Sequence, residues 1–246
     1  MEQVINTIYN IVFPITDLKI YLFICFVILL MFISVMTSRT RIFRTYKKYL
    51  KVPNKAGLTG GQIAAASKKV LDIPNLQFAL VKGTLTDAYS SKHKTLLMSK
   101  DVYESSSLAS MAIIAHEFGH ALQDKSDSTL FFICKITGKI SRIFNKFVFP
   151  LIIFGSGCML VNHFGLYEVE FGFPLILLAV GILVCHFLFQ LLTIPLEYDA
   201  SRRGMNYLTK YQFITEAEHR KVKKLLGCAA QTYIASFFDN ILPSKK

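Results

Sequence analysis

Three long apolar runs are the feature of this 246-residue chain that most constrains its fold. They cover about residues 18–36, 147–161 and 171–194, and the only charge within them is Lys19, at the edge of the first run. An α-helix rises about 1.5 Å per residue, so about 20 apolar residues cross a bilayer. The sequence therefore predicts about three transmembrane helices, in agreement with a hydrophobic fraction of 52% and a mean hydropathy of +0.42. A signal peptide fits the first run poorly, because no basic segment precedes it.

The segments beside these runs predict which side of the membrane they face. Lys and Arg concentrate on the cytoplasmic flanks of transmembrane helices. The basic flanks are Arg39, Arg41, Arg44, Lys47, Lys48 and Lys51; Lys135, Lys139, Arg142 and Lys146; and Arg202 and Arg203. Residues 1–17 and the turn at about 162–170 contain no Lys or Arg. We therefore expect a short external N-terminus, a cytoplasmic region over 37–145, a transmembrane hairpin over 146–194, and a cytoplasmic helical tail over 195–246.

The formal net charge of +12 is explained by these flanks. Nucleic-acid binding is the alternative, but the Lys and Arg residues follow the apolar runs and no recognition motif is present. The five cysteines form no CxxC pair, which argues against a disulfide framework and a cysteine zinc site. We predict an integral membrane protein with no nucleic-acid partner.

The region 37–145 has the mixed composition of a small α+β domain lying on the membrane. The predicted elements are a capped helix over 62–71, strands over 76–81 and 94–99 joined by a polar connection over 83–93, and a helix over 105–123 opened by a serine cluster. The apolar part of the last helix is too short to cross a bilayer, so we expect it in the core.

That last helix contains the run His116-Glu117-Phe118-Gly119-His120, which carries the candidate chemistry. His116 and His120 are four residues apart, so they share one helix face and can ligate one metal ion. Glu117 points to a neighbouring face, where it can accept a proton from a water without ligating the metal. We expect Phe118 to anchor the helix in the core and Gly119 to leave room beside the metal. The pattern predicts one catalytic Zn²⁺ ion.

A catalytic zinc site usually has a third protein ligand, and Glu197 is the best candidate. It stands two residues after Pro195, where the third apolar run ends, so a helix continuing from that run could carry it back to the HEFGH helix. A third His ten residues after His116 is excluded, because position 126 is Ser. The other carboxylates considered are Glu168 and Glu170, which are predicted to lie across the membrane, and Glu216 and Glu218, in a charge-dense segment.

Further residues are candidates for supporting roles. Asp199 and Asp124 could accept a hydrogen bond from a ligating imidazole, or each could be a plain surface aspartate. Candidates for stabilising the oxyanion of peptide hydrolysis are Tyr233, His219, Arg202 and Arg203. The strand over 94–99 precedes the metal helix closely, and an edge strand in such an arrangement can hold an extended substrate by backbone pairing.

Several stretches together resemble a known family. They are Lys94 to Ser99, Asp101-Val102-Tyr103, Ala115 to Gln123, Pro195 to Arg203, and Thr232-Tyr233. They resemble the YugP-like bacterial membrane zinc metallopeptidases, a neutral zinc peptidase family, over nearly the whole chain. The resemblance implies a gluzincin-like site with His116, His120 and Glu197 as zinc ligands and Glu117 as the catalyst. It also implies a location in the bacterial inner membrane, with the site on the cytoplasmic side.

The chain also departs from its relatives. It is similar, more distantly, to the HtpX and CAAX-protease types of membrane peptidase, which carry Asp four residues after the ligand Glu, where this chain has Ser201. The run Asp87-Ala88-Tyr89-Ser90 stands where family members tend to carry a DHYD-like sequence, so the His and the second Asp are missing. The apolar stretch over 225–242 is interrupted by polar residues, and we favour an interfacial helix over a fourth span.

The predicted fold is a mainly α membrane protein with a small α+β, zincin-like catalytic region, in which the transmembrane hairpin separates the HExxH helix from the third-ligand helix. The predicted function is that of a membrane-anchored zinc metalloendopeptidase acting on membrane-associated or cytoplasmic polypeptides. The alternative is a non-proteolytic membrane scaffold that retains a zinc site. An intact Glu117 favours the enzyme, because a structural zinc site has no need of a base.

Overall fold

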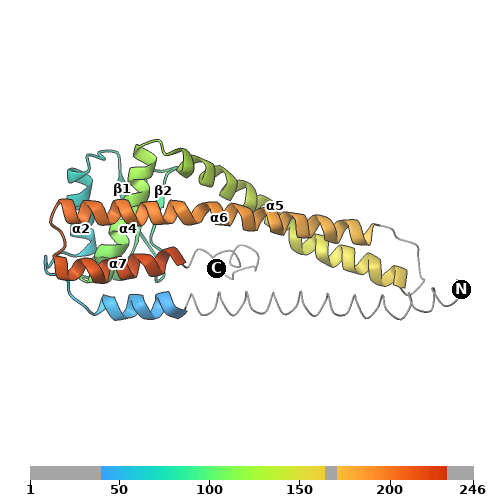
Figure 1. Ribbon diagram of the computed structural model, residues 1–246, viewed down its shortest axis with the longest axis horizontal. Coiled ribbons are helices and arrows are strands. Elements are labelled where there is room, and N and C mark those ends of the chain that lie inside the picture. The colour runs from blue at the N-terminus through green and yellow to red at the C-terminus, as the bar shows by residue number, and fades with distance from the viewer. Residues whose placement is uncertain (1–39, 164–170, 232–246) are drawn as a thin grey trace, which may run out of the picture.

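The computed structural model describes residues 40–163 and 171–231 (Figure 1). A compact helical body with a small sheet lies at one end, and two long helices extend from it together. The predicted mainly helical fold with a small sheet is confirmed. The first predicted span, over 18–36, lies outside the described residues, as do Tyr233 and most of the predicted external turn.

The first described elements are a helix over residues 40–50 and α2 (Gly60–Val70). Thr59 caps α2: its side chain accepts a hydrogen bond from the backbone N–H of Gln62, and its own N–H donates to the Gln62 side chain at 2.9 Å. This reciprocal pair satisfies two of the N–H groups that a helix start leaves unpaired. The predicted helix therefore starts two residues earlier than expected.

The sheet has three strands in the order β1-β3-β2. The central strand β3 (Thr95–Ser99) pairs in parallel with β1 (Gln77–Val81), and both are close to the predicted bounds. The third strand, β2 (Ala88–Ser90), pairs antiparallel with β3 and lies inside the segment predicted to be a polar connection. That prediction was wrong, because a three-residue strand carries no alternating pattern and depends on its pairing with β3. The sequence suggested that the strand over 94–99, which is β3, would be the edge strand beside α4. In the structure the edge strand beside α4 is β2.

After the short α3 (Lys100–Glu104) comes the helix that carries HEFGH, α4 (Leu108–Lys125). It starts at Leu108 because the Ser107 side chain accepts a hydrogen bond from the Ser110 N–H. Almost every residue of α4 is buried, including Phe118 at 0% exposure, as predicted.

The predicted hairpin consists of α5 (Thr129–His163) and α6 (Gly172–Lys210), both long and apolar enough to cross a membrane. Their most hydrophobic windows are only 17% and 12% buried within the protein. Core helices of soluble proteins bury such faces, so these two helices expose a surface suited to lipid. Both helices run further than the apolar segments: α5 starts in the preceding basic region, and α6 continues through Pro195 into the body.

The last described helix, α7 (Glu216–Gln231), packs against α4 and α6. Its Leu225 and Leu226 are buried in the main core. The start of the predicted interfacial stretch over 225–242 thus belongs to the body, and residues after 231 lie outside the described part of the chain.

The crossing of α4 and α6 is exceptionally close. A Cβ atom on Gly119 would lie 2.1 Å from the carbonyl oxygen of Ala200, and one on Gly204 would lie 2.4 Å from that of Ala115. Glycine on each helix thus lets the other helix's backbone approach. The sequence suggested that Gly119 leaves room for the metal, but the space beside it is taken by α6.

Replacing Gly119 with Ala should therefore destabilise the protein by about 1–3 kcal/mol or more, because the added methyl meets backbone and not a flexible side chain. The test is thermal unfolding in detergent micelles. Gly138→Ala is the matched control, since a Cβ at Gly138 in α5 has no atom within 4 Å. Equal stability of the two variants would contradict the close crossing.

Candidate metal centre and active site

Three side chains from α4 and α6 converge at the crossing. Glu197 Oε2 lies 3.0 Å from His116 Nε2 and 3.4 Å from His120 Nε2. All three residues are at least 91% buried, and one ligand atom from each lies within 4.8 Å of the others. Within the described residues, this is the group of His and carboxylate side chains with the geometry to hold a metal ion.

The chain brings Glu197 to the two histidines through the α5–α6 hairpin. His116 and His120 lie one turn apart on α4. Glu197 lies on α6 three residues before Ala200, whose carbonyl oxygen faces Gly119. The close backbone crossing therefore sets the distance between the carboxylate and the imidazoles. The predicted convergence on Glu197 depends on α6 remaining helical after Pro195.

The second nitrogen of each imidazole has a partner. His116 Nδ1 lies 3.1 Å from Ser201 Oγ, and His120 Nδ1 lies 3.0 Å from Gln123 Oε1. If each Nδ1 carries the hydrogen and donates it, both Nε2 lone pairs face Glu197. This is the tautomer that a metal ligand needs.

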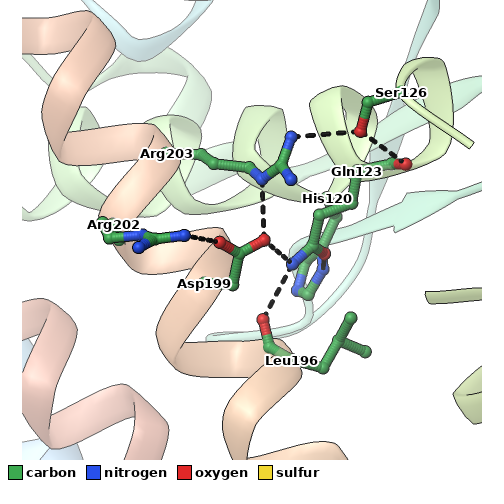
Figure 2. Close-up of polar contacts among 7 residues, drawn as sticks. All are labelled: His120, Gln123, Ser126, Leu196, Asp199, Arg202 and Arg203. Carbon is green, nitrogen blue, oxygen red and sulfur yellow. Dashed lines mark hydrogen bonds and ion pairs between the residues drawn. The ribbon is translucent and has the colours of Figure 1, made fainter. Parts of the chain in front are cut away.

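Gln123 is held in turn by α6, as Figure 2 shows. Its amide nitrogen donates to the Leu196 carbonyl and to Asp199 Oδ2, each at 2.9 Å. These two acceptors fix which end of the amide faces His120. Asp199 also accepts hydrogen bonds from Arg202 Nη2 at 2.5 Å and from Arg203 Nε at 2.7 Å (Figure 2).

The donor set fits a zinc ion. Zinc bonds of about 2.0–2.2 Å in a tetrahedral site place neighbouring ligand atoms about 3.4 Å apart, close to the two distances between Glu197 and the imidazoles. Glu197 Oε2 is buried and makes no hydrogen bond of normal geometry among the described residues. Burial by itself lowers the pKa of His120, but the adjacent Glu197 carboxylate raises it to about 9. The site therefore favours positive charge, which a divalent cation supplies.

Glu117 lies beside this group without joining it. Its Oε2 accepts a hydrogen bond from the backbone N–H of Tyr89 in β2 at 2.7 Å. Burial raises the pKa of the Glu117 carboxyl, and the neighbouring imidazoles only partly offset this. A carboxylate with a raised pKa is a better proton acceptor at neutral pH.

The proposed supporting residues are placed in different ways. Asp199 contacts His120 only through Gln123. Asp124 Oδ2 accepts hydrogen bonds from Tyr89 Oη and Lys94 Nζ, each at 2.6 Å, so it links α4 to β2 and to the residue that precedes β3. Tyr233 lies outside the described residues.

A large cleft opens onto the site. It has a volume of about 920 Å³, and Glu117, His120 and Glu197 line it together with residues of β2 and α5. A smaller cavity of about 210 Å³ reaches His116 and Glu117 and is mostly apolar. The catalytic candidates are therefore accessible although they are largely buried.

Comparison with known proteins agrees with this geometry. Residues 22–243 match the family described as "Putative neutral zinc metallopeptidase". The chain belongs to this family. It is 32% identical to "Putative membrane protease YugP" of Bacillus subtilis over 203 residues, which is 81% of this chain and 83% of that protein. No solved structure matches the chain significantly.

Three contacts of this zinc metallopeptidase family member were not predicted from the sequence. Gln123 lies three residues after His120 on one helix face, a spacing that could have indicated it. Ser201 likewise lies four residues after Glu197, so the two residues share one face of α6. The Tyr89 contact had no such signal, because it depends on the unexpected strand β2.

The Gln123 contact predicts a measurable effect on metal binding. Replacing Gln123 with Ala removes the acceptor for His120 Nδ1 and should weaken zinc affinity about 10–100-fold. Competition with a chromophoric chelator measures this affinity. Gln77→Ala, an exposed amide in β1, is the matched control. Unchanged zinc affinity in the Gln123 variant would show that the hydrogen bond does not orient the ligand.

Proposed function

We propose that this chain is a membrane-anchored zinc metalloendopeptidase that hydrolyses peptide bonds of membrane-associated or cytoplasmic polypeptides. The observation that carries the proposal is the placement of Glu117 in an open cleft, directly beside the converging side chains of His116, His120 and Glu197. A structural metal site needs neither the adjacent carboxylate nor the cleft.

In this proposal His116, His120 and Glu197 hold one Zn²⁺ ion. When bound, the ion supplies Lewis-acid chemistry, polarising the scissile carbonyl and making a water more acidic. Ser201 and Gln123 keep the two imidazoles oriented through their Nδ1 atoms.

Glu117 is the general base. The Tyr89 N–H holds one carboxylate oxygen, which leaves the other to take a proton from the attacking water. The same carboxyl then passes this proton to the amine that leaves. Its raised pKa suits both directions of transfer near neutral pH.

The endopeptidase assignment rests on the shape of the site. Extended substrates bind well along an edge strand by backbone pairing. In β2 the edge that is not paired with β3 faces the site, since the Tyr89 N–H donates to Glu117. With that donor held by Glu117, a substrate chain would pair with other backbone groups along this edge, where residues 90–92 also line the cleft. The cleft continues past this strand along α5, which gives room for a chain on that side of the scissile bond.

The cytoplasmic location of the site is supported by charge. Lys135, Lys139, Arg202 and Arg203 lie in the parts of α5 and α6 that are nearest the body, where the site is. Basic flanks of spans remain in the cytoplasm, which supports an active site on the inner face of the bacterial membrane.

Glu117→Gln should lower the rate of cleavage of an unfolded, fluorescently labelled polypeptide by about 10²–10⁴-fold, because the amide cannot accept the proton. Zinc content should stay at the wild-type level. Glu104→Gln, an exposed carboxylate on α3, is the control. Cleavage by the Glu117 variant at the wild-type rate would refute the proposed mechanism.

Glu197→Ala should remove zinc from the purified protein, because two imidazoles alone make a weak site. Metal analysis after dialysis measures this loss. Glu216→Ala, an exposed glutamate on α7, should retain zinc. A Glu197 variant with undiminished zinc would show that another residue provides the third ligand.

A further inference from the structure

Three basic residues of α5 line the same cleft as the catalytic candidates. Lys135, Lys139 and Arg142 share this cavity with Glu117 and Glu197. They are spaced i, i+4 and i+7, so they form one continuous face of the helix. We call this face the basic wall. At about 1.5 Å per residue it is about 10 Å long, the length of about three residues of extended chain.

The charges of the basic wall are unpaired in the part of the chain that the structure describes. None of its three members forms an ion pair there. The carboxylates that line the cleft are otherwise engaged: Asp87 accepts hydrogen bonds from Ser99, and Glu117 and Glu197 belong to the catalytic group. A cleft with unpaired cations attracts and holds an anionic partner.

A role in determining the membrane topology explains the presence of these three cations but not the direction in which they face. Topology requires Lys and Arg near the membrane end of the helix, but it does not require them to face the catalytic cleft. Lys146 illustrates the difference: it is exposed on the same helix, one turn beyond Arg142, and does not line the cleft. Lipid phosphates bound at the membrane surface would be contacted by Lys146 as readily as by the wall.

We propose that the basic wall is a specificity determinant, selecting polypeptide segments that carry Asp or Glu within a few residues of the cleaved bond. The inference rests on the proposed peptidase function and adds the substrate class. The substrate lies against β2 next to the zinc site, and its acidic side chains meet Lys135, Lys139 and Arg142.

Binding tests the wall without turnover. The full-length Glu117→Gln protein, with zinc, is titrated with peptides of one central sequence whose flanks carry Glu, Gln or Lys. We expect the Glu peptide to bind about tenfold more tightly than the Gln peptide at low salt, with the difference shrinking at high salt. Equal affinity for the Glu and Gln peptides would overturn the proposal.

Variants of the basic wall test whether its three residues cause the preference for the Glu peptide. Replacing Lys135, Lys139 and Arg142 together with Gln should abolish the preference and leave affinity for the neutral peptide unchanged. The charge reversal Lys139→Glu should shift preference toward the Lys peptide. Lys146→Gln is the matched control and should behave as the parent protein. The titrations are repeated with the protein in nanodiscs of neutral lipid and of lipid with added anionic headgroups. An equal loss in the Lys146 variant, or a loss that follows the anionic lipid content, would assign the cations to lipid and overturn the proposal.

Cleavage of the same peptides by the wild-type protein separates the two levels of inference. Faster cleavage of the Glu peptide supports both. Cleavage of all peptides at one rate would refute the role of the basic wall in specificity and leave the peptidase assignment intact. Absence of cleavage with a retained binding preference would refute the peptidase assignment, and the cleft would remain as a binding site for acidic peptides.

Discussion

The backbone contact between α4 and α6 is the constraint on which the rest of the site depends. Gly119 and Gly204 let the carbonyl groups of Ala200 and Ala115 approach to distances that no Cβ would allow. At this separation a carboxylate on one helix reaches imidazoles on the other. A larger residue at either glycine would move Glu197 away from the histidines, so packing and metal geometry are one requirement in this protein.

Hydrogen bonds then fix what the crossing brings together. Gln123 belongs to α4 but is bound by the Leu196 carbonyl and Asp199 of α6, so it orients His120 and also joins the two helices. Tyr89 plays a comparable part on the other side, with its backbone holding Glu117 and its hydroxyl holding Asp124. The proposed base and one proposed ligand are therefore positioned by residues that have no part of their own in the proposed chemistry.

The hairpin of α5 and α6 contributes to the proposed active site and is also the candidate membrane anchor. Helix α6 passes without interruption from its apolar segment to Glu197, and α5 supplies the cleft with the basic wall before it enters its own apolar segment. Forming the hairpin in the bilayer thus completes both the proposed zinc site and the proposed substrate path. This arrangement suits substrates that are already held at the membrane surface.

The sequence alone predicted the residues whose roles depend on local spacing. The i, i+4 histidines with Glu117, the apolar lengths of the hairpin and the presence of capped helices near 62–71 and 105–123 all follow from helix geometry. Glu197 could be selected as a candidate, because few other carboxylates were compatible with the topology. Only the tertiary structure showed that Gln123, Ser201 and Tyr89 contact the site. It also showed that three of the basic residues used to predict the membrane topology line the cleft. The contacts of Gln123 with α6 and of Ser201 with His116 join segments far apart in the chain, and the Tyr89 contact depends on a three-residue strand. Such features leave no periodic pattern in the sequence.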